Sequence, residues 1–253
     1  PAGGTLAGKL EHMDGYASGL YTNNVIRSSD LNSLANWTST TFVSKQIQQD
    51  RTVGLVKFKN QLLAFCDNTV EPFYNAGNAS GSPFTGIKQL AQRVGLIPTS
   101  NVYGTHYYAI LNEKLFFIGR KAGGLSSVGL FQYDGSNYVK VSSEYIDKIL
   151  GELILNSGQH NYFSIMSFGF HGKSAIAIQT TAPTITSQQW LMFFPEWNDW
   201  FVWKSSVYSP VNNGEYFLGT GSNSHRTYNF PSTNNWQDDG TSYQYMTQFS
   251  LPD

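Results

Sequence analysis

A hairpin unit recurs about four times along the chain, and it limits the possible folds more than any other feature. Each unit has a short apolar strand, a turn rich in Gly, Asn or Asp, and a second strand rich in aromatic residues. The units lie at residues 53–66, 107–118, 163–178 and 216–228. A single hairpin cannot bury its own apolar face, so the units must pack on one another. Repetition at roughly 50 residues, with several short strands in each repeat, is typical of the blades of a propeller.

The composition supports an all-β fold. Aromatic residues make up 15% of the 253 residues and charged residues only 13%, with 24 glycines, which favours strands and turns over salt-bridged helices. We therefore predict a β-propeller, or part of one, built from antiparallel blades. It forms a single domain or a fragment of one over residues 1–253. The blade-like units cover approximately residues 14–75, 84–150, 151–207 and 208–253.

Local patterns predict particular turns and one helix. Asp134-Gly135 separates two alternating strands, which is the strongest short hairpin signal. Apolar residues at helical spacing predict a helix over residues 144–153. Residues 28–33 are expected to cap a short helical turn. Residues 86–95 fit either a short strand or a short helix, and periodicity does not separate the two.

The charges and the single cysteine exclude several classes of function. Net charge is −1 and the lysines and arginines are scattered, which disfavours tight binding along a phosphate backbone. Cys66 is expected to be a buried structural residue, because a catalytic thiol needs a positioned histidine and the nearest in sequence is His106. No two histidines lie within five residues of each other. We predict no catalytic residue, no cofactor and no metal site.

The sequence also bears on membrane and carbohydrate functions. The apolar runs are far shorter than the roughly 20 residues that span a bilayer, and the N-terminus has no signal-peptide pattern, so no membrane association is expected. The carboxylates show no spacing that indicates a glycosidase pair. A carbohydrate-binding or glycan-processing propeller remains an alternative if aromatic rings are exposed; buried rings would weaken it. The candidate rings are Trp197, Trp200, Trp203 and Trp236.

Two stretches of the chain resemble a known family. The first runs through Ile26-Arg-Ser-Ser-Asp30, Asp50-Arg-Thr-Val-Gly-Leu55, Asn68-Thr-Val-Glu-Pro-Phe-Tyr-Asn-Ala-Gly77 and Ser82-Pro-Phe84. The second runs through Leu115-Phe-Phe-Ile-Gly-Arg120, Val128-Gly-Leu-Phe131 and Lys140-Val-Ser-Ser-Glu-Tyr-Ile146. In this order the segments are similar to the packaged-DNA stabilisation proteins of short-tailed phages of the P22 type, which form the tail hub or nozzle.

The resemblance implies a structural protein of the virion tail that is not an enzyme. It implies a hexameric ring below the portal and adaptor that retains the packaged genome and serves as an assembly platform for other tail proteins. DNA would pass nearby without sequence-specific binding. Family members are usually longer, so a fragment or a shortened relative is expected. A propeller that binds peptides on its face is a third reading, based on the fold alone.

Exposed loops are the predicted places of partner contact, because connections between strands often carry recognition. The two candidates are residues 75–84 and residues 120–127. A role as simple connectors is an equally open alternative. The candidate contact residues are Asn75, Gly77, Asn78, Ser82, Phe84, Arg120 and Lys121.

Overall fold

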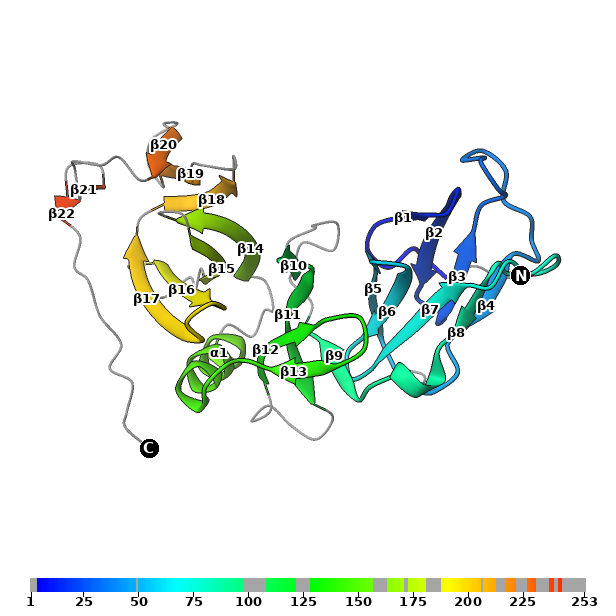
Figure 1. Cartoon of the computed structure of the whole chain (residues 1–253), viewed down its shortest axis with the longest axis horizontal. Coiled ribbons are helices and arrows are strands. Elements are labelled where there is room, and N and C mark those ends of the chain that lie inside the picture. The colour runs from blue at the N-terminus through cyan, green and yellow to red at the C-terminus, as the bar shows by residue number, and fades with distance from the viewer. Residues whose placement is uncertain are drawn as a thin grey trace.

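The computed structural model shows a chain of antiparallel sheets joined in sequence order (Figure 1). It describes residues 4–48, 50–97, 108–121, 128–156, 163–170, 173–180, 188–205 and 207–212. It also describes shorter pieces at residues 217–221, 227–230, 237–238 and 241–242. One α-helix, α1 (Glu144–Asn156), lies among these residues together with the short 3-10 turn η1 (Lys88–Leu90).

The first two sheets are four-stranded meanders, in which each strand pairs with the next one along the chain. The first contains β1 (Glu11–Met13), β2 (Tyr16–Tyr21), β3 (Val25–Ser28) and β4 (Phe42–Ser44). The second contains β5 (Thr52–Phe58), β6 (Gln61–Cys66), β7 (Val70–Asn75) and β8 (Phe84–Gly86).

The third sheet has five strands and the fourth has four. The third contains β9 (Val94–Leu96), β10 (Tyr108–Leu111), β11 (Lys114–Lys121), β12 (Val128–Tyr133) and β13 (Tyr138–Lys140). β9 and β10 pair with different halves of β11. The fourth contains β14 (Phe163–Phe170), β15 (Lys173–Thr180), β16 (Gln188–Phe194) and β17 (Asp199–Ser205).

Smaller sheets follow the fourth. β18 (Val207–Asn212), β19 (Phe217–Gly221) and β20 (Thr227–Phe230) form a three-stranded sheet, and β21 (Gln237–Asp238) pairs with β22 (Thr241–Ser242). The expected unit at residues 14–75 covers most of the first sheet and three strands of the second. The expected unit at 208–253 lies largely outside the described residues.

Successive sheets pack face to face through apolar side chains. Side chains of adjacent strand residues point to opposite faces of a sheet. Phe117 accordingly joins the cluster shared with the second sheet, where its ring meets Phe65 at 4.9 Å between centroids. Phe116 joins the cluster shared with the fourth sheet, where it lies 6.2 Å from Phe193. The all-β, propeller-like class predicted from the sequence is confirmed by this arrangement.

Several local predictions can be checked directly. The helix expected at residues 144–153 is α1, and Ile146 and Leu150 are buried against the third and fourth sheets. Residues 86–95 contain both η1 and the start of β9. The helical turn expected at residues 28–33 was wrong: residues 31–32 form a plain turn, fixed by the bond from Asn32 N to Gly15 O at 2.8 Å.

The turns that connect strands in one sheet contact the turns at the same end of the neighbouring sheet. At one end, here called the turn end, the β1–β2 and β7–β8 connections meet where Asn75 Nδ2 donates to Asp14 Oδ2 at 3.1 Å. The β5–β6 and β12–β13 turns meet there too, because Lys59 Nζ donates to Asp134 O at 2.7 Å. The opposite end, the crossover end, carries residues 22–24, 45–48, 50–51 and 67–69.

The β12–β13 turn gives a first prediction. Asp134 Oδ1 accepts hydrogen bonds from the backbone N–H groups of Asn137 and Ser136, each at 2.8 Å. These bonds lower the pKa of Asp134 to about 2. Asp134→Ala is expected to lower the free energy of unfolding by about 1 kcal/mol at pH 7, as for a lost hydrogen bond.

The pH dependence of this effect has a definite sign. The carboxyl group has a lower pKa in the folded state, so its stabilisation is present above pH ~4 and is lost as the pH falls toward 2. Urea unfolding would measure the free energy of unfolding of the wild type and of Asp134→Ala at pH 7 and at pH 2. The difference between the two proteins should be smaller at pH 2. A difference that is unchanged at pH 2 would mean that the ionised carboxylate is not responsible.

Candidate functional site

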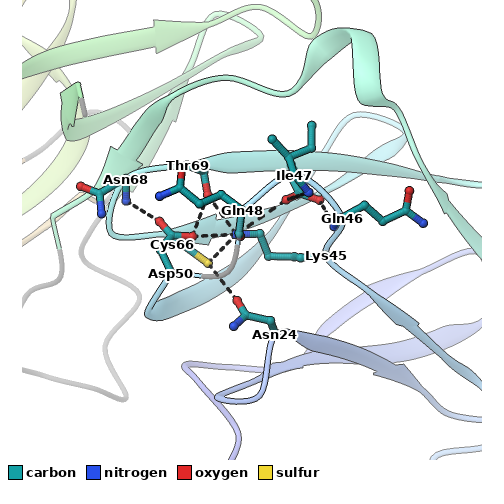
Figure 2. Close-up of polar contacts among 10 residues, drawn as sticks. Asn24, Lys45, Gln46, Ile47, Gln48, Asp50, Cys66, Asn68 and Thr69 are labelled. Carbon is teal, nitrogen blue, oxygen red and sulfur yellow. Dashed lines mark hydrogen bonds and ion pairs between the residues drawn. The ribbon is translucent and has the colours of Figure 1, made fainter. Parts of the chain in front are cut away.

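A buried lysine organises the crossover end between the first two sheets. Lys45 follows β4 directly, in the segment that carries the chain into β5, and its side chain is fully buried. Figure 2 shows it at the centre of contacts from several separate segments of the chain. A buried ammonium group is costly unless it is paired and hydrogen-bonded, so its partners determine whether the site is stable.

The ammonium group of Lys45 has close partners in the two segments around it. Nζ lies 3.0 Å from Asp50 Oδ1, 2.9 Å from Thr69 Oγ1 and 3.1 Å from the carbonyl oxygen of Gln48. It also lies 2.9 Å from Cys66 Sγ. These contacts join the crossover segment to the β6–β7 turn.

Backbone donors hold the two carboxylates of the cluster. Asp50 Oδ2 accepts from the N–H of Asn68 at 2.7 Å. Glu71, in β7, accepts from the N–H groups of Gln46 and Ile47 at 2.9 and 3.0 Å. Its Oε1 lies 3.8 Å from Lys45 Nζ. Both carboxylates are almost fully buried. Asp50 lies in the crossover segment and accepts from the β6–β7 turn, whereas Glu71 lies in β7 and accepts from the crossover segment.

The pKa values of the cluster fit a buried ion pair beside a neutral thiol. Burial alone would raise the pKa of Asp50, but the N–H of Asn68 and the Lys45 ammonium hold it below 3.8. Burial would lower the pKa of Lys45, but its contacts with Cys66 and Asp50 raise it above 10.5. Burial raises the pKa of Cys66 to about 12, so this thiol is protonated at neutral pH.

These properties give the cluster a structural role. Cys66 is fully buried, as the sequence predicted, and a protonated buried thiol is a poor nucleophile. The cluster instead connects the crossover segment with β6, β7 and the turn between them. We call this arrangement, formed by Lys45, Asp50, Cys66, Thr69 and Glu71, the crossover clamp.

The thiol supplies a second prediction. In the folded protein at pH 8, Cys66 is expected to react with a disulfide reagent such as DTNB at least about a hundredfold more slowly than in 6 M guanidinium chloride. The reason is its burial and its raised pKa. Absorbance at 412 nm measures the rate. Equal rates in the two solvents would mean that the crossover clamp opens readily.

The third sheet is joined at the same end through Asp67. Arg51 binds its carboxylate with two nitrogens, Nε at 3.0 Å from Oδ2 and Nη2 at 3.1 Å from Oδ1. Arg120, near the end of β11, donates from Nε to the backbone oxygen of Asp67 at 3.1 Å. The β6–β7 turn of the second sheet therefore contacts both the segment that follows the first sheet and strand β11 of the third sheet.

The first predicted contact loop is partly buried. Gly77 and Asn78 are exposed, and Asn75 is half-buried with its Oδ1 accepting from Gly77 N at 2.9 Å. Ser82 and Phe84 are instead buried, and Phe84 belongs to β8. Their predicted exposure was wrong: the strand pairing of β8 with β7 turns Phe84 into the core, where its ring centroid lies 5.9 Å from that of Tyr16.

The second predicted contact loop is described only at its start. Arg120 is 28% exposed and engages Asp67, and Lys121 is exposed at the end of β11. Residues 122–127 lie outside the described residues.

Among the four tryptophans proposed for a carbohydrate site, Trp197 and Trp200 are the two whose side chains the structure describes. Trp200 is buried in the core between the third and fourth sheets, which weakens the carbohydrate alternative. Trp197 is 54% exposed, stacked on Phe194 at 5.2 Å. The side chain of Trp203 and the whole of Trp236 lie outside the described part of the chain.

The described residues contain neither a metal-binding cluster nor a helix that could span a membrane. Within them, no three side chains of the His, Cys, Asp or Glu type gather in a way that could hold a metal ion. The only helices described are too short or too polar to cross a bilayer. Sequence reasoning missed the crossover clamp, because no local pattern distinguishes Lys45 from an exposed lysine.

The comparison with known proteins agrees with the sheet architecture. A protein-family profile described as Bacteriophage P22 Gp10, beta-propeller, matches residues 7–181. The match begins before β1 and runs through all of the first three sheets and the first two strands of the fourth. No individual curated protein matches the chain. The matched span exceeds half of the sequence, and the chain belongs to the family of phage P22 Gp10, the β-propeller stabilisation proteins of the virion tail.

Proposed function

We propose that this chain is a structural subunit of a phage tail that assembles into a hexameric ring below the portal and adaptor. There it helps to retain the packaged DNA and serves as a platform for other tail proteins, without catalytic activity. Membership of the P22 Gp10 family, over residues 7–181, is the observation that carries the proposal. A ring follows when each copy contacts the next through a different surface and the rotation closes.

The crossover clamp supports this role physically. A subunit that holds pressurised DNA benefits from blades that do not move against each other. In this chain the first two sheets share an apolar core, Lys45 in the segment between them lies 3.8 Å from Glu71 of the second sheet, and Asp67 links the second sheet to the third. We propose that residues 1–253 act as one propeller-like unit in the tail.

The mass of the purified protein in solution tests the proposal. Light scattering after size exclusion would be measured with and without a recombinant portal–adaptor complex. The expected result is a ring, either of the protein alone or formed on that complex. A protein that stays monomeric and does not bind the portal–adaptor complex at micromolar concentration would overturn the proposal.

A carbohydrate-binding role is a second candidate because of Trp197. Its exposed ring lies beside the ion pair of Lys173 and Glu196, whose Nζ and Oε2 are 2.6 Å apart. Exposed indole rings with polar neighbours can stack on sugars, as they stack on other flat or apolar groups. Glycan-array binding that disappears in Trp197→Ala would favour this role, and an array without signal would remove it.

A further inference from the structure

Two Asp-Gly pairs stand in hairpin turns at the turn end, and their surroundings differ. Asp14-Gly15 connects β1 with β2, and Asp134-Gly135 begins the β12–β13 turn. An Asp-Gly pair is chemically labile, because glycine has no side chain that would keep its backbone nitrogen away from the preceding carboxyl group. The contacts of each carboxyl group therefore decide how fast the pair can react.

The carboxylate of Asp134 is held by its own turn. Its Oδ1 accepts hydrogen bonds from the backbone N–H groups of Asn137 and Ser136, each at 2.8 Å, and from Ser136 Oγ at 3.0 Å. These bonds fix the orientation of the carboxyl group and lower its pKa to about 2. At neutral pH almost none of it is in the protonated form, from which an oxygen leaves most easily as water.

The carboxylate of Asp14 is held much less firmly. Its side chain is exposed, and in the described part of the chain its donor is the side-chain amide of Asn75, with Nδ2 at 3.1 Å from Oδ2. The backbone of Asp14 also has a φ of 52°, in the left-handed region that costs free energy for a residue with a Cβ. Asp134 does not adopt this conformation.

We propose that Asp14-Gly15 is a site of spontaneous isoaspartate formation in the folded protein. The backbone nitrogen of Gly15 attacks Cγ of Asp14, the new N–Cγ bond closes a succinimide ring, and the carboxyl hydroxyl group leaves with the amide proton as water. Water then adds to the backbone carbonyl carbon of Asp14, and the original peptide bond to Gly15 breaks. The main chain now runs through Cβ, and the water taken up in the second step replaces the water lost in the first.

The product would disturb the contacts of the β1–β2 turn. An isoaspartate link adds one methylene group to the main chain between two strands that are paired in register. The carbonyl oxygen of Gly15 accepts from Asn32 N at 2.8 Å, and Asn75 depends on the position of the Asp14 carboxylate. The modified protein should therefore lose contacts that join this turn to the β3–β4 and β7–β8 connections.

The test follows both sites in one sample of the purified chain, kept at pH 7 and 37 °C. Trypsin releases Asp14 in the peptide of residues 10–27 and Asp134 in the peptide of residues 122–140, and each peptide has a single aspartate. After the peptides are separated, an isoaspartate methyltransferase labels the product with a methyl group from S-adenosylmethionine. In the native protein, Asp14 is expected to isomerise at least about fivefold faster than Asp134, whose hydrogen bonds must first break.

Unfolding should remove this difference, because both aspartates precede glycine. In 6 M guanidinium chloride the two rates are expected to agree within about twofold. Asp14→Glu should abolish the signal in peptide 10–27 and leave the rate at Asp134 unchanged, since glutamate would have to close a larger ring.

Three outcomes would overturn the proposal. They are no product at Asp14, a rate at Asp134 that equals or exceeds the rate at Asp14 in the native protein, and a difference that persists in guanidinium chloride. The last would mean that the neighbouring residues, and not the fold, set the two rates. None of these measurements requires a ring or a portal–adaptor complex, so their outcome is independent of the proposed function.

Discussion

Replacing Lys45 by methionine is expected to lower the free energy of unfolding by about 3–5 kcal/mol, the usual cost of removing one partner of a buried ion pair. The methionine fills a similar volume but cannot donate to Asp50, Thr69 or the Gln48 carbonyl. Asp50 and Glu71 would stay buried without a cation. Urea unfolding followed by tryptophan fluorescence would measure the loss.

Lowering the pH should reduce the difference in the free energy of unfolding between Lys45→Met and the wild type. The folded-state pKa of Asp50 lies below its ordinary value, so the ion pair stabilises the protein above pH ~4 and is lost as the pH falls through the folded-state pKa. Lys148→Met is the matched control, because that side chain is 76% exposed. Similar losses in the two variants would mean that burial of Lys45 does not matter.

Gly95→Ala is expected to destabilise the protein by about 3 kcal/mol or more, at the upper end for overpacking of a filled site. A Cβ at this position would lie 1.9 Å from the carbonyl oxygen of Asp67 and 2.3 Å from the backbone nitrogen of Asn68. Backbone atoms cannot rotate away as a flexible side chain can, so β9 must separate from the β6–β7 turn.

Gly86→Ala provides the control for Gly95→Ala. It lies in β8, and the three atoms nearest to its added Cβ all belong to the ring of Phe73, the first at an ordinary contact distance of 3.4 Å. Its effect on the midpoint of thermal unfolding should be small. If Gly95→Ala unfolds at the same temperature as Gly86→Ala, the close approach of β9 to the turn does not hold in solution.

The features that the sequence predicted well are those with local causes. The Asp134–Asn137 turn is fixed by bonds within four residues, and the apolar spacing of α1 is readable along one segment. The propeller-like class followed from repetition of such local units. The error at residues 28–33 has a nonlocal cause, because the bond from Asn32 to Gly15 comes from another part of the sheet.

The candidate sites were largely unpredictable for the same reason. Lys45 is buried only because Asp50, Thr69 and Glu71 reach it from the adjoining segment and from β7 and its preceding turn. Phe84 stands next to a run of turn-forming residues, so the sequence indicates an exposed loop at this position. Its pairing within β8 decides otherwise, and no short pattern reveals that pairing.

The strict meander order of the sheets has a consequence for synthesis. The first sheet is complete once residue 44 has emerged from the ribosome, and the second once residue 86 has followed. Each new sheet then finds its apolar partner already formed, which limits the time that an open face is available for aggregation. Lys45, however, must wait for Glu71, so translation itself sets the moment at which the first two sheets become locked together.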